Sequence, residues 1–288
     1  MDLSIIIPSF NTKQLTQRCL QSIFQTVKQS ELKYEVIVVD NASKDGSVEI
    51  LNKKYPQVIK ILNKRNVGYG TANNQGIEAA KGMYVLLLNS DIVALPGSIQ
   101  SLVAFARSHP KSFAGGKLYN EDGTAQPSCG PMFTPWYVFL MLFCQADEFG
   151  VTRASPVMMK RVAWVSGACL LGTKKSFLDV GRFDESIFMY MDEIEFLYRA
   201  GKKGYSVWFT PSARFTHTGA ASSGNKRKPV VNIFRGLMYF YKKHFPIYLA
   251  LLRFMLTVKG KIAILIGTIL GKKDLVQIYE EGLQLVHQ

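Results

Sequence analysis

Cysteines are few in this sequence, and none is placed for disulfide or metal chemistry. The 288 residues contain no CxxC pair, and the 4 cysteines are widely spaced: Cys19, Cys129, Cys144 and Cys169. This spacing excludes a disulfide scaffold and a cysteine-based zinc site. We therefore expect reduced thiols, as in a cytosolic protein.

Long apolar runs and the common phosphate-binding loops are also missing. The apolar stretch from Met132 to Cys144 is thirteen residues long, which is too short to span a bilayer as a helix. No basic segment precedes the first apolar run, so we expect no secretory signal peptide. Neither GxGxxG nor GxxxxGK followed by Ser or Thr occurs, which excludes a Rossmann fingerprint and a P-loop.

Acidic residues are outnumbered, 21 against 35 basic ones, which gives a net charge of +14. From Lys226 onward there are eleven Lys or Arg and three Asp or Glu, so more than half of the excess lies in the last fifth. Such asymmetry indicates that the protein binds a nucleic acid, an anionic membrane or an anionic substrate. Because these basic residues are interleaved with apolar ones, we expect no nucleic-acid partner.

Short apolar runs alternate with helix-like segments in the first half of the chain. We expect strands at 5–7, 36–39, 58–62 and 84–88, the first ending at Pro8, and helices near 14–29, 45–54, 71–81 and 97–108. Continuous apolar strands with helical crossovers predict an α/β fold. Its central sheet is expected to be mostly parallel, with helices on both faces.

Polar residues directly follow three of these strands. They are Ser9, Asn11, Asp40, Asn41, Asn89 and Asp91. In open α/β sheets the ligand lies outside the carboxyl ends of the strands, so this pattern predicts a binding crevice there. The alternative is turn and helix-cap chemistry, in which Asn, Asp and Ser are common.

Two glycines, Gly68 and Gly70, precede a predicted helix. They could let the backbone approach a phosphate at the helix N-terminus. A flexible strand-to-helix connection is the alternative, and the local sequence does not decide between the two.

The second half of the chain has a less regular pattern. The apolar stretch 132–144 is predicted to be core rather than a lipid-facing surface, and strands are expected at 164–171 and 205–209. From Val230 the pattern indicates two basic, apolar helices. They form either a lid on the catalytic domain or an element lying in a membrane interface.

Acidic residues open a helix at Asp192. The helix dipole and an i,i+4 pair between Glu195 and Arg199 explain at least two of them, and a catalytic carboxylate among them is the alternative. His217 lies beyond the strand at 205–209 without a cluster of other metal ligands. A lone His is more often a hydrogen-bonded structural residue.

Taken together, the motifs resemble family 2 glycosyltransferases of the GT-A fold, close to bacterial rhamnosyltransferase-like members. The resemblance runs from Leu3 to about Lys243. It rests on seven segments in order: Ile7–Asn11, Val39–Ser47, Asn66–Gly76, Leu88–Asp91, Ser166–Ala168, Gly181–Glu185 and Met191–Arg199. It implies a nucleotide-diphospho-sugar transferase domain over residues 1–225 and a basic, apolar helical tail over 226–288.

The resemblance also implies roles for residues in the crevice. The nucleotide-sugar would be held by Pro8, Ser9, Asn11, Asp40, Asn41, Asn66, Gly68, Gly70, Asn89 and Ser90. Asn89-Ser90-Asp91 takes the place of the family's DxD motif, so its first acid is missing. Asp91 and His217 would bind a divalent metal, Mg²⁺ or Mn²⁺, that bridges the two phosphates.

The family's general base is implied at the start of the acidic helix. The family usually has Glu-Asp there, whereas this chain has Asp192-Glu193. The role is carried to Glu193, with Asp192 as the other candidate, in a single inverting displacement. The reversed pair and the lone Asp91 also motivate an alternative, a catalytically inactive module that acts as a membrane-recruited binding partner.

The donor implied is TDP-rhamnose or a UDP-sugar. The acceptor is a hydroxyl of a growing cell-surface polysaccharide, expected to be lipid-linked. With the basic, apolar tail, this predicts a cytoplasmic enzyme in peripheral contact with the inner face of a bacterial cell membrane.

Overall fold

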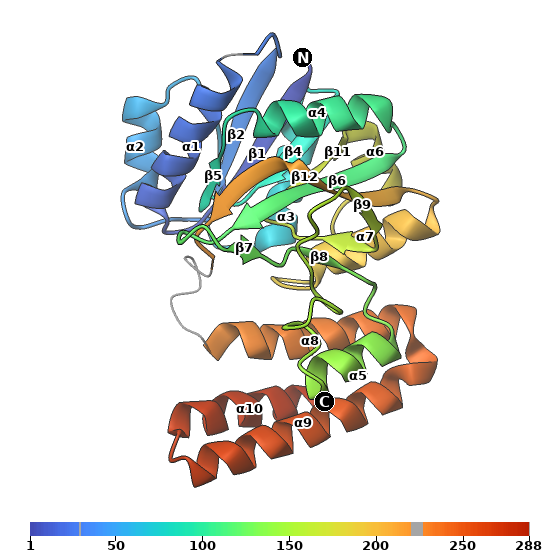
Figure 1. Ribbon diagram of the computed structural model, residues 1–288. Helices are drawn as coiled ribbons and strands as arrows, with labels where there is room; N and C mark the ends of the chain where they lie inside the picture. Colours follow the sequence, from blue (N-terminus) through green and yellow to red (C-terminus); the bar gives the residue numbers. More distant parts are fainter. Residues whose placement is uncertain (29, 220–226, 288) are drawn as a thin grey trace.

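The computed structural model describes residues 1–28, 30–219 and 227–287. An α/β domain with a central sheet lies above a layer of helices built mostly from the end of the chain (Figure 1). The predicted boundary at residues 225 and 226 lies outside the described residues.

The main sheet is mixed, and six of the eight strands along its path run in the same direction. In spatial order they are β3 (Ile59–Leu62), β2 (Tyr34–Asp40), β1 (Leu3–Ser9), β4 (Tyr84–Leu88), β11 (Cys169–Thr173), β6 (Ser112–Tyr119), β12 (Ser206–His217) and β5 (Ile92–Ala94). The two reversed strands are β11 and β5. Short strands extend this sheet, β7 (Ala125–Gln126) on β6 and β9 (Lys160–Val162) on β12, while β8 (Cys129–Gly130) pairs with β10 (Trp164–Val165).

Helices cover both faces of the sheet, as the sequence predicted. One face packs against α1 (Lys13–Val27), α2 (Ser47–Lys54) and α4 (Ser98–Ser108). The other packs against α3 (Tyr69–Ala79), α6 (Lys174–Val180) and α7 (Asp192–Lys202). Alternate residues of β1 explain its unbroken apolar run, because Ile5 and Ile7 enter the first core and Ile6 enters the second.

Three strands differ most from their predicted bounds. The first continues through Pro8, which lies opposite Val39, and ends at Ser9 level with Asp40. The strand expected at 164–171 is divided into β10 and β11 by a turn in which the Cys169 N–H donates to the Ser166 carbonyl at 3.2 Å. The strand expected at 205–209 continues, through a register shift, to His217, so His217 is the last residue of β12 rather than a residue beyond the strand.

The apolar stretch 132–144 is only partly core, which corrects the prediction. It contains α5 (Pro135–Phe143), where Val138 and Leu142 are buried, while the Trp136 side chain is 63% exposed and Phe139 is 40% exposed. A nine-residue helix on the surface of a domain has only one face toward the protein, so an all-apolar helix leaves apolar side chains outside.

Within residues 227–287 the tail forms three α-helices instead of the two expected. They are α8 (Arg227–His244), α9 (Leu249–Ile269) and α10 (Lys273–Val286), with a 3-10 turn, η1 (Pro246–Tyr248), before α9. Their buried side chains, among them Phe240, Leu252 and Val286, belong to the same core as α7. Among the described residues no helix combines the length and apolarity needed to cross a membrane.

A buried carboxylate joins α8 to α7. Glu195 is fully buried, and its oxygens accept hydrogen bonds from Arg199 Nε at 2.9 Å and from His244 Nε2 at 2.9 Å. Lys243 Nζ lies 2.9 Å from Glu195 Oε1 and also contacts the Asp184 carboxylate. Burial alone would raise the pKa of Glu195, but the bonds from Arg199, Lys243 and His244 outweigh burial and lower that pKa below its ordinary value of 4.5.

We predict that Glu195→Gln destabilises the protein at neutral pH by about 3 kcal/mol, because Arg199 and Lys243 lose their shared buried anion. Since the pKa is lower in the folded state, this stabilisation is complete above pH 4.5 and is lost as the pH falls through the lowered value. Urea unfolding at several pH values measures it. The matched control is Glu121→Gln, whose ion pair with Arg18 is half exposed and should contribute less than about 1 kcal/mol. Equal effects of the two substitutions would contradict this account.

Candidate active site

A cleft of about 340 Å³ opens at the carboxyl ends of β1, β2 and β4, facing the start of α7. Eleven of the residues predicted for the site line it: Pro8, Ser9, Asn41, Asn66, Gly68, Asn89, Ser90, Asp91, Asp192, Glu193 and His217. The strands therefore bring together side chains from positions 8 to 217, as expected from their shared direction.

Three predicted residues, Asn11, Asp40 and Gly70, lie beside the cleft but do not line it. Asn11 holds the loop after β2, because its Oδ1 accepts from the Lys44 N–H at 2.8 Å. Asp40 is almost completely buried and accepts from the Ser43 N–H at 2.9 Å through Oδ1. Its other oxygen, Oδ2, is buried without a hydrogen-bond partner in the described part of the chain, and such a group normally has one.

The two glycines allow close packing rather than flexibility. Gly68 has a φ of +89°, and a Cβ added there would lie 2.5 Å from the Phe188 carbonyl oxygen. That carbonyl accepts from the Tyr69 N–H at 3.0 Å. A Cβ at Gly70 would lie 3.1 Å from the Phe183 Cβ. Both glycines thus fit the start of α3 against the segment that leads into α7.

Asp91 and His217 meet at one end of the cleft, with Asp91 Oδ1 3.3 Å from His217 Nε2. The other ring nitrogen, Nδ1, lies 2.7 Å from Gln126 Oε1, and Gln126 Nε2 donates to Asn120 Oδ1 at 3.1 Å. Because that donation leaves the Gln126 oxygen as acceptor, we assign the proton of His217 to Nδ1. The Nε2 lone pair then faces the Asp91 carboxylate, and the Asn89 amide nitrogen lies 3.5 Å from Nε2, where it can donate a hydrogen bond.

The donor set at this point fits a divalent ion shared with a substrate. Within the described residues no group of three or more His, Cys, Asp and Glu side chains could hold a metal. One carboxylate and one imidazole, both largely buried, leave most coordination positions to phosphate oxygens and water, as is usual for Mg²⁺.

Asp192 and Glu193 lie on the first turn of α7, after two residues with left-handed backbone, Tyr190 (φ +64°) and Met191 (φ +66°). Such conformations are unfavourable outside glycine and are often found at functional sites. Burial, and then the charge of Glu193, raise the pKa of Asp192 well above its usual range. Burial also raises the pKa of Glu193, against hydrogen bonds from backbone N–H groups and the positive charge of Arg153. Both carboxyl groups therefore bind a proton more tightly than they would in water.

Sequence reasoning missed several residues of the cleft. Arg153 lines it, with its guanidinium 5.6 Å from the centre of the Trp164 ring, and Tyr69 donates to the Gly167 carbonyl at 2.5 Å. Burial raises the pKa of Tyr69, so its hydroxyl stays protonated. Tyr69 lies inside the predicted glycine motif, whereas nothing local marks Arg153.

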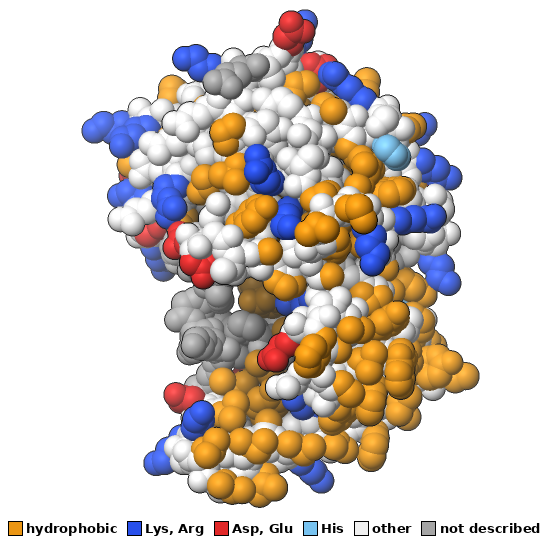
Figure 2. Space-filling model, viewed as in Figure 1, with side chains coloured by type: hydrophobic (Ala, Val, Ile, Leu, Met, Phe, Trp, Pro, Cys, Tyr) orange, Lys and Arg blue, Asp and Glu red, His pale blue; other side chains and the backbone are white. Residues whose placement is uncertain are grey.

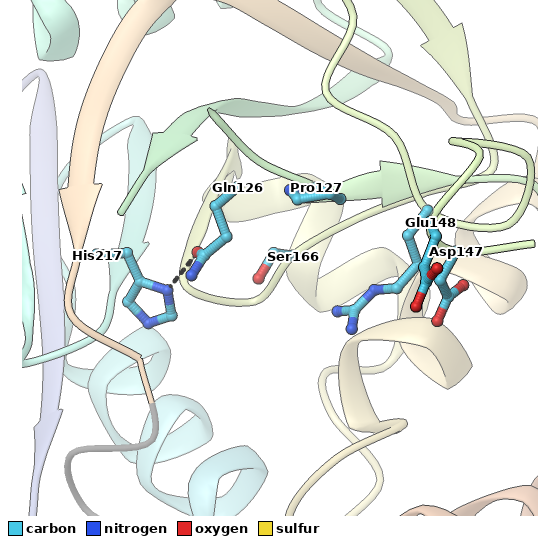
Figure 3. Close-up of a pocket in the computed structure, with 7 residues that line it drawn as sticks. Gln126, Pro127, Asp147, Glu148, Ser166 and His217 are labelled. Atoms are coloured by element: carbon cyan, nitrogen blue, oxygen red, sulfur yellow. Dashed lines mark hydrogen bonds between the residues drawn. The ribbon is translucent and has the colours of Figure 1, made fainter. Parts of the chain in front are cut away.

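A second cavity of about 430 Å³, which we call the side pocket, adjoins the cleft. The two cavities share Arg153, Ser166 and His217. The other lining residues of the side pocket are Gln126, Pro127, Asp147 and Glu148. Figure 3 shows His217 and Gln126 on one side, Asp147 and Glu148 on the opposite side, and Ser166 between them.

Comparison with known proteins agrees with this geometry. The model of the family described as "Glycosyl transferase family 2" matches residues 4–140. An N-acetylglucosaminyl-diphospho-decaprenol L-rhamnosyltransferase from Mycobacterium tuberculosis is 31% identical over an alignment of 224 residues, which covers 68% of this chain and 70% of that protein. A poly(ribitol-phosphate) beta-glucosyltransferase from Bacillus spizizenii is 35% identical over an alignment of 132 residues, which covers 44% of this chain but 20% of that protein.

Two solved structures share the fold. GalNAc-T7, crystallised with UDP, GalNAc and Mn²⁺, superposes with a TM-score of 0.61 at 18% identity, over 84% of this chain and 50% of that one. Residues 1–349 of S. aureus TarS superpose with a TM-score of 0.56 at 16% identity, over 99% of this chain and 81% of that one. The chain therefore has the GT-A fold and belongs to glycosyltransferase family 2, with rhamnosyltransferase-like sequence.

Proposed function

We propose that this protein is a metal-dependent inverting glycosyltransferase. It moves a sugar from TDP-rhamnose or a UDP-sugar to a hydroxyl of a growing, lipid-linked cell-surface polysaccharide. The observation that carries the proposal is the meeting of the Asp91–His217 pair with the Asp192–Glu193 pair in one cleft. The acceptor class is supported by the relatives' names, which specify a diphospho-decaprenol and a poly(ribitol-phosphate).

The nucleoside of the donor lies at the ends of β1 and β2 in this proposal. Pro8, Ser9, Asn41 and Asn66 line the cleft there, while Asn11, Asp40 and Gly70 shape the loops behind it. The buried, unpartnered Oδ2 of Asp40 is the group that a base or ribose donor would satisfy.

The diphosphate lies toward Asp91 and His217, beside Asn89 and Ser90. A bound Mg²⁺ or Mn²⁺ neutralises the negative charge of the leaving nucleoside diphosphate. Gln126 would fix the His217 tautomer that leaves Nε2 free to bind such an ion, and Asp91 would supply the anionic ligand.

The Glu193 carboxylate is the general base. It takes the proton of the acceptor hydroxyl, the oxygen forms a bond to the anomeric carbon, and the bond to the nucleoside diphosphate breaks in the same displacement. Asp192 keeps its proton in this proposal. Because it is then neutral, it does not repel the Glu193 carboxylate as a second anion would. No sugar becomes attached to the protein.

The helical layer has an exposed apolar face formed by α5, η1 and α9. α5 and α9 pack together, and Figure 2 shows apolar side chains gathered over them at the lower right. The most exposed are Trp136, Ile247, Phe254, Leu265 and Ile269. Arg253 and Lys261 are exposed between these residues. Apolar surface interleaved with basic residues is typical of binding in a membrane interface, so we place the enzyme in the cytoplasm, against the inner face of the bacterial cell membrane.

The reversed Asp192-Glu193 pair also supports a second candidate, an inactive module recruited to the membrane. This candidate requires nucleotide binding or membrane binding without turnover. It is therefore excluded by any donor turnover that Glu193→Gln abolishes.

Nucleotide binding gives the first prediction for the site. In the presence of Mn²⁺, either UDP or TDP at 100 times its dissociation constant should stabilise the protein by about 2.7 kcal/mol, measured by thermal shift. Asp91→Asn should remove most of this stabilisation, because the ion loses its carboxylate. The control, Asp122→Asn, alters an exposed turn outside the cleft and should keep it. No shift with either nucleotide would contradict the proposal.

The base assignment predicts a pH profile. Because the pKa of Glu193 is raised, the acidic limb of kcat/KM should lie above pH 4.5, with activity lost below it. Arg153→Gln removes a cation that lowers this pKa and should shift the limb to higher pH. Glu193→Gln should lower kcat by about 10² to 10⁴ with nucleotide binding intact, whereas Asp192→Asn should retain more activity. The reverse ranking would assign the base to Asp192.

Membrane contact is tested by flotation with vesicles of phosphatidylglycerol and phosphatidylcholine. The wild type should float with the anionic vesicles, and Trp136→Ser combined with Phe254→Ser should weaken binding by about tenfold or more, given the apolar area removed. A double variant outside the helical layer, Ile59→Ser with Leu62→Ser on β3, changes apolar side chains that are 37% and 53% exposed and should bind like wild type. Equal binding by both double variants would contradict the assignment of this face.

A further inference from the structure

We propose that the side pocket is the acceptor subsite, and that Asp147 and Glu148 select an uncharged sugar by accepting hydrogen bonds from its hydroxyl groups. This inference rests on the proposed function and deepens it. The pocket is lined by carboxylate, amide and hydroxyl groups of Gln126, Asp147, Glu148 and Ser166. These are the groups that bind saccharide hydroxyls.

The position of the side pocket relative to the base supports this role. Ser166 belongs to its wall and directly precedes Gly167, whose backbone N–H donates a hydrogen bond to Glu193. His217, on the other side, is shared with the cleft. A sugar in the side pocket would therefore meet the general base on one side and the diphosphate end of the donor site on the other.

The charge of the pocket favours a neutral sugar over an anionic group. Asp147 and Glu148 stand against one cation, Arg153, whose guanidinium lies against the Trp164 ring and whose charge also acts on Glu193. A diphosphate group, whether of the donor or of a lipid-linked acceptor, would be repelled by these carboxylates and would lie outside the pocket. A neutral sugar would not, whereas a uronic acid would be disfavoured in the same way.

The Asp147 carboxylate is held by its own loop. Asp147 Oδ1 accepts a hydrogen bond from the Thr152 hydroxyl, and the N–H groups of Val151 and Thr152 donate to the Ala146 carbonyl at 2.9 and 3.3 Å. Groups fixed before binding lose little conformational entropy when they bind. The same loop carries Phe149, which is 76% exposed, so it presents an apolar side chain beside the saccharide subsite, as suits an acceptor with a lipid portion.

The test compares Asp147→Asn and Glu148→Gln with Asp122→Asn in the full chain. Asp122 is a matched control because it also accepts from a threonine hydroxyl, that of Thr124, but lies in an exposed turn outside both cavities. The probe is a short-chain N-acetylglucosaminyl-diphospho-lipid. The readouts are the acceptor KM, the donor KM and the slow hydrolysis of donor by water without acceptor.

We expect the acceptor KM to rise about tenfold in each pocket variant, the loss expected for one hydrogen bond to a charged group. The donor KM and the hydrolysis rate should stay unchanged, and the control should match wild type in all three. The double variant should also use a uronic-acid acceptor better, relative to the neutral one, than wild type does.

If both pocket variants transfer sugar with an unchanged acceptor KM, the subsite inference is wrong but the proposed function stands. The same holds if only the donor KM rises. A wild-type protein that neither transfers sugar nor hydrolyses any donor contradicts the proposed function and, with it, this inference. The two failures are therefore distinguishable.

Discussion

The buried carboxylate of Glu195 is the interaction on which the arrangement of catalytic domain and tail depends. A buried anion must be paired, and the partners of Glu195 come from two elements, Arg199 on α7 and Lys243 and His244 on α8. The same α7 begins with Asp192 and Glu193. The helix that carries the proposed base is thus fixed, one turn later, to the helix that opens the tail, so the position of the tail and the geometry of the site are coupled.

The sheet supplies the other half of the site. β1 and β2 end level with each other, and the turn after β4 holds Asp91. β12 continues through a register shift until His217 reaches that turn. Gln126, on the short β7, orients the His217 ring. The site therefore needs both the parallel half of the sheet, β3 to β4, and the mixed half, β11 to β5. The side pocket lies where the mixed half meets the loop after α5.

Much of the fold and part of the site could be predicted from the sequence. Strands such as Val36–Val39 and the polar residues after them carry local signals, namely a continuous apolar run and an abrupt polar end. The full length of β12 and the exposed face of α5 could not be predicted, because they depend on which neighbour covers each residue. Arg153 and Gln126 were missed for the same reason, since they reach the site only through contacts with residues far away in the chain. The roles of all the predicted site residues remain predictions; the structure gathers eleven of them in one cleft, and Asn11, Asp40 and Gly70 are not among the residues that line it.

The central claim is that Glu193 and the Asp91–His217 pair act on one anomeric carbon in a single displacement. The most direct measurement is the anomeric configuration of the product by NMR, with TDP-rhamnose and UDP-sugars as donors and Mn²⁺ present. The account predicts a glycosidic bond inverted relative to the donor, with no sugar attached to the protein at any time. A product with retained configuration, or a glycosylated protein intermediate, would contradict it.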